Sequence, residues 1–328
     1  MLDPSQFAHL SEEDYVKWTK RVTPQENDIV FSYEATLGRY AVIPKNFYGC
    51  LGRRLAIVRI INDELNAKWL YYYFRSPEWT SFIKNQTVKG STVDRISIEE
   101  FPEYTIPVIS LEDQNKIVDV LDKIDRKIAD NKKINDYLEQ QALLIFRYMF
   151  KNISNGSNHV GDYITPKRGK ALLSKDAIPG QFPVIAGGLL PATYHNRANT
   201  VAPVLTISGS GANAGYVNIW HDPIWSSDSS FIDYEMTTNV YFWYAFLKLR
   251  QQDIFDIQTG SAQPHIYPKH IAELSIGNID RFQIASYITQ VTPLFTKAGA
   301  NIRETKRLQQ LRDWLLPMLM NGQVTIED

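Results

Sequence analysis

The sequence predicts an α/β (α+β) protein in which two duplicated, mixed α/β domains are separated by an antiparallel two-helix coiled coil. Two observations carry this prediction: a pair of long segments with coiled-coil spacing, and an internal repeat of near-constant offset. We expect a first domain at 1–110, a coiled-coil helix at 111–150, a linker and second domain at 151–281, and a second helix with a tail at 282–328.

The first long segment, 111–150, contains no Gly and no Pro and consists mostly of strong helix formers. Its seam positions alternate between steps of four and three, and are Ile117, Leu121, Ile124, Ile128, Asn131, Asn135, Leu138, Ala142, Ile145 and Met149. This spacing predicts a coiled-coil helix about 60 Å long. The two Asn residues favour a paired coil, because polar seam residues fix the register at a cost in stability. The alternative is a single long core helix.

The second long segment, 282–322, carries a similar seam with one slip. The seam residues are Ile284, Ile288, Val291, Phe295, Ala298 and Ile302, and after the slip Leu308, Leu311, Leu315 and Met318. Pro293 predicts a kink or a break, because proline removes a helical hydrogen bond. Gly322 predicts the C-terminal end of the helix.

An internal repeat relates the two domains. The loop GSTVDRI at 90–96 recurs 170 positions later as GSAQPHI at 260–266, and the aromatic run at 71–74 falls on the run at 241–244 at the same offset. The starts of the two helices match at an offset of 167. The chain is therefore predicted to be domain and helix, repeated once. We place both aromatic runs in the domain cores.

The repeat also predicts how the helices pair. Because the termini of a domain usually lie close together, the second helix should start near the end of the first and run back along it. The helices then pair antiparallel, and a pseudo-twofold axis relates the two domains. Such a dyad suits a reader of a two-part DNA site.

Composition places the chain among ordinary soluble proteins, with 328 residues, 44% of them hydrophobic and 22% charged. No apolar run is long enough to span a membrane, and the first residues do not resemble a signal peptide, so we expect a cytoplasmic protein with no membrane partner. The single cysteine, Cys50, excludes an internal disulfide and is expected to be a small buried hydrophobe. A net charge of -1 gives no global sign of a nucleic-acid partner and does not exclude one, because local patches matter more.

Catalytic signals are weak throughout the chain. The glycine-rich run at 206–215 lacks the Lys-Ser/Thr of a phosphate-binding loop. His265 and His270 lack companion ligands at metal-binding spacing. No serine elbow and no Asn/Asp-Pro-Pro-aromatic run of an amino-methylating enzyme is present. We therefore expect no catalytic residues, no metal and no cofactor.

Signals for binding duplex DNA are stronger. Basic residues from 162 to 215 outnumber acidic ones by five to two, and they alternate with aromatic and amide side chains. Basic groups hold phosphates, while Asn, Gln, Ser and His reach base edges. The predicted DNA-binding residues are Lys167, Arg168, Lys170, Tyr194, His195, Arg197, Ser210, Asn213, Gln263 and His265, with Lys89, Ser91, Thr92 and Arg95 in the first domain. The alternative for each loop is an ordinary turn.

These residues resemble a family, the specificity subunits of type I restriction-modification systems. Similar motifs are Asp125-Arg-Lys-Ile128, Gly161-Asp-Tyr-Ile164, Phe182-Pro-Val-Ile185, Trp225-Ser-Ser-Asp228 and Leu311-Arg-Asp-Trp314. The resemblance covers nearly the whole chain. It implies a non-catalytic subunit that reads a bipartite DNA site with two target-recognition domains. It also implies methyltransferase subunits and restriction (translocase/nuclease) subunits as partners.

The chain departs from this pattern at its front. The strand predicted near 204 begins about 43 residues after Gly161, whereas the strand predicted near 29 begins only 28 residues after Met1. The first domain should therefore lack counterparts of 167–170 and 186–197, and we expect it to gain order from a second copy, a separately encoded fragment or a docked subunit. Two rival interpretations are a coiled-coil scaffold without DNA readout and a methyltransferase fusion, which the missing motifs disfavour.

Overall fold

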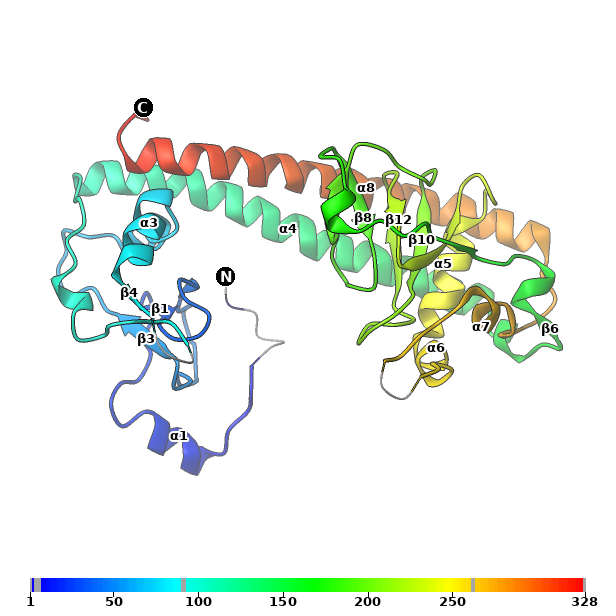
Figure 1. The fold of residues 1–328 in the computed structure, drawn as a ribbon, viewed down its shortest axis with the longest axis horizontal. Coiled ribbons are helices and arrows are strands. Elements are labelled where there is room, and N and C mark those ends of the chain that lie inside the picture. The colour runs from blue at the N-terminus through cyan, green and yellow to red at the C-terminus, as the bar shows by residue number, and fades with distance from the viewer. Residues whose placement is uncertain (1, 3–6, 90–92, 261–262, 327–328) are drawn as a thin grey trace. The chain divides into compact units, whose positions relative to one another are not determined.

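The computed structural model describes residues 2, 7–89, 93–260 and 263–326. Two compact units make up the fold (Figure 1): unit 1 comprises Met1–Ala129 and Lys306–Asp328, and unit 2 comprises Asp130–Thr305. The long helices α4 (Leu111–Met149) and α8 (Arg281–Met320) contribute to both units. Within the described ranges, no helix is both long and apolar enough to cross a membrane.

Unit 1 is built on a small antiparallel sheet. Its elements before α4 are α1 (Glu12–Trp18), β1 (Ile29–Ser32), β2 (Tyr40–Val42), β3 (Leu55–Val58), α2 (Ala67–Tyr73), α3 (Pro77–Gln86), β4 (Thr87–Val88), β5 (Arg95–Ile96) and η2 (Phe101–Glu103). The order is β2-β1-β3, with β1 central and buried at every position. Asn66 caps α2 and Ser76 caps α3, each accepting hydrogen bonds from backbone amides of the first turn. The aromatic residues of α2 fill the core together with Ile117 and Leu121 of α4.

Unit 2 is larger and has two main sheets. Its elements between α4 and α8 are η3 (Ile153–Asn155), β6 (Asn158–His159), η4 (Val160–Asp162), β7 (Lys167–Arg168), η5 (Ser174–Asp176), β8 (Phe182–Ile185), β9 (Thr193–His195), β10 (Val204–Ser208), β11 (Val217–Trp220), β12 (Trp225–Ser226), β13 (Ser229–Asp233), α5 (Val240–Leu249), α6 (Gln251–Asp256), α7 (Pro268–Ala272) and β14 (Ser275–Ile276). The main sheet has the order β11-β10-β13-β7, and a smaller sheet has the order β12-β8-β9. Helix α5 packs against β10 and β11 and is buried along most of its length (Figure 1).

The two units share one topology. In each, a central strand pairs with the next strand on one side and with a later strand on the other, and a helix pair follows. The registers agree as well, since Ile29 pairs with Val58 and Val204 pairs with Asp233. Unit 2 adds β7 along β13, together with the sheet of β8, β9 and β12. Among the described residues of unit 1 no strand takes these places.

The two long helices run antiparallel within each unit. In unit 2, Gln283 of α8 donates to the Met149 carbonyl at 2.7 Å, whereas Asn301, later in α8, donates to Asn135, earlier in α4, at 2.9 Å. In unit 1, the still later Arg312 donates to the still earlier Asp125 at 2.8 Å. The predicted antiparallel pairing is therefore confirmed.

The seam of α8 differs from the prediction in its middle part. Helix α8 continues through Pro293 without a break. Ile302, predicted in the seam, is 47% exposed, and Asn301 is buried in its place at 2%. Leu311 is likewise 43% exposed, and the neighbouring Arg312 faces α4. The slip thus comes before Ile302, because Asn301 forms a polar layer with Asn135 and Asn131.

A two-strand stem joins the inserted domain of unit 2 to the helices. β6 pairs antiparallel with β14, His159 against Ser275, so the entering and leaving strands lie side by side. Backbones approach closely here: a Cβ added to Gly156 would lie 2.1 Å from the Ile276 carbonyl oxygen. The stem therefore brings the ends of the inserted domain together.

His221 lies where the main sheet of unit 2 meets α8. Its ring packs against Phe295 with centroids 6.1 Å apart, and its side chain fills the space over Gly299. The charged groups that face it are Asp222 and Arg303, which form an ion pair at 2.9 Å. Burial lowers the pKa of His221 to about 4, so the imidazole is neutral at physiological pH.

Candidate nucleic-acid interface

Loops of unit 2 converge where β10 ends. Arg168 ends β7, Ser210 follows β10, and Asp228 precedes β13. Since β13 runs antiparallel to both β7 and β10, these three positions meet at one edge of the sheet. The Asp228 carboxylate accepts hydrogen bonds from Nη2 of Arg168 and from Oγ of Ser210.

Gly209 and Tyr267 complete the surroundings of the Arg168 guanidinium. A Cβ added to Gly209 would lie 2.3 Å from Nη1 of Arg168, so the guanidinium lies directly over this glycine and would have to shift if a side chain were added there. Cζ of Arg168 is 5.9 Å from the ring centroid of Tyr267. The ring of His265 stacks on the Tyr267 ring, with centroids 6.0 Å apart.

The remaining predicted residues of unit 2 divide into exposed and half-buried groups. Those exposed to solvent are Lys167, Lys170, Tyr194, Arg197 and Gln263. Asn213 is half-buried, and its carbonyl accepts a hydrogen bond from the Tyr216 amide. Exposed basic side chains of this kind are suited to contacts with phosphates.

His195, one of the predicted DNA-binding residues, is largely buried. It is only 7% exposed, and its Nδ1 accepts a hydrogen bond from the Ile178 amide at 3.0 Å. Its ring packs edge-on against Trp225 at 5.0 Å. The side chain is therefore buried between β9 and its neighbours.

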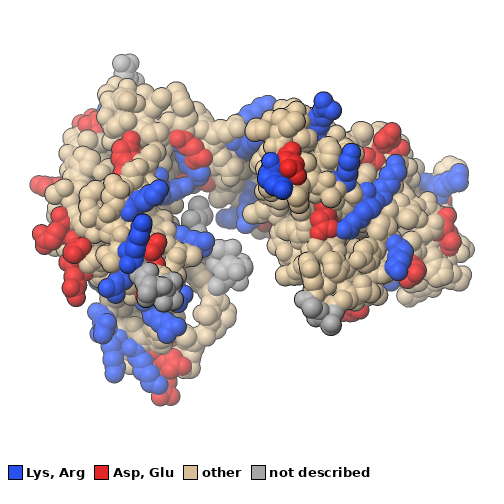
Figure 2. Space-filling view, viewed as in Figure 1, with Lys and Arg blue, Asp and Glu red and all other residues tan. Residues whose placement is uncertain are grey.

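Unit 1 carries a basic surface at the equivalent end of its central strand. Glu34 forms a β-bridge with Arg95 and an ion pair with Arg54 at 3.5 Å, as Ser210 forms a bridge with His265 in unit 2. The exposed basic residues of this surface are Arg39, Arg53, Arg54, Lys89 and Arg95. Figure 2 shows Lys and Arg side chains gathered over the part of unit 1 that contains the sheet and α1. Ser91 and Thr92, also predicted, lie outside the described residues.

Several residues of these surfaces were missed at the sequence level. The repeat points to 90–96 but carries no signal for Arg39, in the β1–β2 loop, or for Arg53 and Arg54, which directly precede β3. Asp228 lies in the quoted motif 225–228, yet its partner Arg168 is 60 positions away. Within the described ranges no group of His, Cys, Asp and Glu side chains is arranged to hold a metal ion.

Comparison with known proteins finds similarity to specificity subunits of type I restriction enzymes. Residues 7–140 match the family model described as the type I restriction modification DNA specificity domain. The type I restriction enzyme MjaIX specificity subunit of Methanocaldococcus jannaschii is 23% identical over 361 residues, which cover 98% of this chain and 82% of that protein.

A second curated relative and a solved structure point the same way. The putative type I restriction enzyme specificity subunit S.HindORF215P of Haemophilus influenzae is 28% identical over 123 residues, 36% of this chain and 29% of that protein. The crystal structure of the S subunit of a type I restriction-modification system from M. genitalium has a TM-score of 0.58, with 21% sequence identity, covering 90% of this chain and 83% of that chain. At this identity the likeness shows a shared fold.

Proposed function

We propose that the chain is a type I restriction-modification specificity subunit, a non-catalytic subunit that reads a bipartite DNA site, one half-site with each unit. The match of residues 7–140 to the specificity-domain family model and the similarity to the M. jannaschii specificity subunit support this proposal. The observation that carries this proposal is the duplicated topology. Each unit presents the end of its central strand next to a bridged residue, Arg95 in unit 1 and His265 in unit 2. Two copies of one reading surface suit a two-part site.

The contacts to DNA divide by chemistry. Lys167, Lys170 and Arg197 are exposed cations and hold phosphates, a contact that carries no sequence information. Gln263 and His265 offer hydrogen bonds to base edges in the major groove. We place the protein in the cytoplasm, where it has access to genomic DNA.

The paired helices set the spacing between the half-sites in this proposal. One added heptad in each helix lengthens the coil by about 10.5 Å and preserves the seam. At about 3.4 Å per base pair, the spacer should grow by about three base pairs while the half-site sequences stay the same. A change in the bases of either half-site would show that the helices are not a separate spacer.

The exposed side of α4 offers a docking surface for the methyltransferase subunits. Ile134, Tyr137, Leu144 and Tyr148 recur at heptad-like spacing and are between 39% and 76% exposed. This is an apolar stripe of the kind that a partner helix covers. We propose that the methyltransferase subunits dock here and that the restriction subunits join the resulting core.

Copurification tests the docking surface directly. Leu144→Asp should abolish association with the methyltransferase subunits, because a carboxylate would be desolvated beneath the partner helix. The matched control is Gln140→Asp, which places the same charge on an exposed position of the same helix. Retained association of Leu144→Asp would locate the docking surface elsewhere.

Methylome sequencing of cells that carry this chain with its methyltransferase subunits tests the proposed function as a whole. We expect one bipartite motif, and we expect the purified chain to bind duplexes carrying it with a steep dependence on salt. Salt-independent association, with no methylated motif, would instead indicate a coiled-coil scaffold without DNA readout.

A further inference from the structure

We propose that Arg168 reads a guanine in the half-site bound by unit 2, and that Asp228 is the positioning residue that presents its guanidinium. This inference rests on the proposed function and adds to it the identity of one base and of the side chain that selects it. The structure that carries it is the cluster of Arg168, Asp228, Ser210, Gly209 and Tyr267 at the end of β10.

The guanidinium of Arg168 is held on three sides. Nη2 donates to Oδ1 of Asp228, whose other oxygen accepts the Ser210 hydroxyl, so the carboxylate itself is fixed. Gly209 lies beneath the guanidinium, and the Tyr267 ring lies within cation–π distance. The carboxylate fixed by Ser210 distinguishes this cluster from a pair of mobile surface side chains.

The fourth side of the guanidinium remains open. The side chain of Arg168 is 37% exposed, and Nε and Nη1 have no acceptor among the residues that the structure describes. The cluster therefore presents unused N–H donors in a fixed orientation. Asp228 takes one N–H of Nη2, and the second N–H of Nη2 forms a planar fork with the N–H of its neighbour, Nε or Nη1. Such a fork matches a pair of acceptors that lie side by side.

Charge decides between a phosphate and a base as the partner. The Asp228 carboxylate already neutralises Arg168, so the pair exerts little net attraction on a phosphate and repels one that approaches Oδ1. Hydrogen bonds to a neutral base edge remain favourable. In the major groove guanine presents two acceptors, O6 and N7, whereas adenine replaces one of them with the N6 donor. Guanine is therefore the base that the cluster selects.

Two variants of the cluster should have different effects on DNA binding. Arg168→Lys keeps the positive charge and loses the fork, so it should reduce the preference for guanine at one position by about 5- to 150-fold with little change in salt dependence. Asp228→Asn frees the guanidinium for a phosphate. The variant should also lose guanine preference, while the slope of log K against log[salt] steepens by up to about 0.9. Lys170→Ala is the control, and should make the slope shallower without changing the motif.

The experiment is selection by the purified full chain from a duplex library with randomised half-sites, followed by binding titrations across salt concentrations. Hydrogen exchange of the β7 and β13 peptides establishes that each variant is folded. Loss of the guanine in both variants, with the steeper slope only in Asp228→Asn, supports the proposal. A wild-type motif that Arg168→Lys leaves unchanged overturns this inference alone. A wild-type chain that selects no duplex overturns the proposed function and this inference with it.

Discussion

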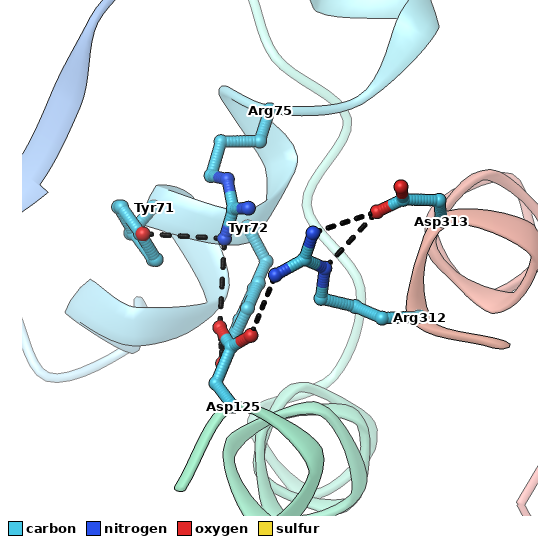
Figure 3. Close-up of polar contacts among 6 residues, drawn as sticks. All are labelled: Tyr71, Tyr72, Arg75, Asp125, Arg312 and Asp313. Atoms are coloured by element: carbon cyan, nitrogen blue, oxygen red, sulfur yellow. Dashed lines mark hydrogen bonds and ion pairs between the residues drawn. The ribbon is translucent and has the colours of Figure 1, made fainter. Parts of the chain in front are cut away.

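The carboxylate of Asp125 in α4 links this helix to α2 and α8 within unit 1 (Figure 3). Replacing it tests how much buried polar contacts stabilise that unit. Asp125 of α4 accepts a hydrogen bond from Tyr72 of α2 at 3.1 Å and from Arg312 of α8 at 2.8 Å. Nη1 of Arg75 lies 3.5 Å from the same carboxylate. Burial, reinforced by Asp125, raises the pKa of Tyr72, so its hydroxyl remains a donor. Asp125→Ala removes all three contacts.

The magnitude of the effect follows from burial. Removing one partner of a fully buried ion pair costs about 3–5 kcal/mol, and an exposed pair contributes about 0–1 kcal/mol. The side chains of Asp125, Arg312 and Arg75 are 15%, 17% and 27% exposed, so water partly compensates the two cations that are left behind. We expect Asp125→Ala to lower the free energy of unfolding of unit 1 by about 2–3 kcal/mol.

Denaturant titration followed by hydrogen-exchange mass spectrometry measures this loss. Peptides of α2 should lose protection, and peptides of α5 in unit 2 should change little. The matched control is Asp313→Ala, because Asp313 pairs with the same Arg312 but is 64% exposed, and its loss should cost less than about 1 kcal/mol. An equal loss for the two variants, or a loss spread evenly over both units, would refute the argument from burial.

Three further predictions concern pH, the polar layer and the first domain. The folded-state pKa of His221, about 4, lies below the unfolded value near 6.5, so the unfolded chain takes up the proton first as the pH falls. Unit 2 should therefore lose about 2 kcal/mol between neutral pH and pH 5, and His221→Gln should flatten this dependence in urea titrations at each pH. Replacing Asn135 and Asn301 by Leu should raise the melting temperature but permit self-association, visible by light scattering. Limited proteolysis with mass spectrometry should cut the domain of unit 1 before that of unit 2, since β3 has no strand on its outer side among the described residues; equal resistance would contradict this.

Periodicity made the long helices predictable, and duplication made their direction predictable. The periodicity relates residues a few positions apart, and the duplication relates residues at one fixed offset. Both can therefore be recognised without knowledge of any tertiary contact. The seam in the middle of α8 was predicted wrongly. Ile302 is apolar and its neighbour Asn301 is polar, so the hydrophobic pattern favoured Ile302 as the buried residue. The hydrogen bond between Asn301 and Asn135 instead favours the buried amide, and that bond depends on the partner helix.

The candidate interface was predictable by residue type but not by arrangement. Basic and amide residues of 167–213 indicate a polar surface that binds nucleic acid, and most of them are exposed. The sequence does not show which of these side chains contact one another. The Arg168–Asp228 pair, for example, forms only because β7 pairs with β13. The burial of His195 was equally unpredictable, because it depends on neighbouring side chains and not on residue type.

The stem formed by β6 and β14 has a consequence for inheritance. The chain enters the second domain at Asn158 and leaves it at Ile276, and these two residues are paired neighbours in one small sheet. The gene segment that encodes residues 158–276 can be exchanged by recombination, provided that the incoming domain begins and ends with two strands that pair antiparallel as β6 and β14 do. Helices α4 and α8 would then be joined to the new domain by a stem with the same backbone hydrogen bonds between its two strands. New recognition could then arise in one genetic event, without any compensating change elsewhere in the chain.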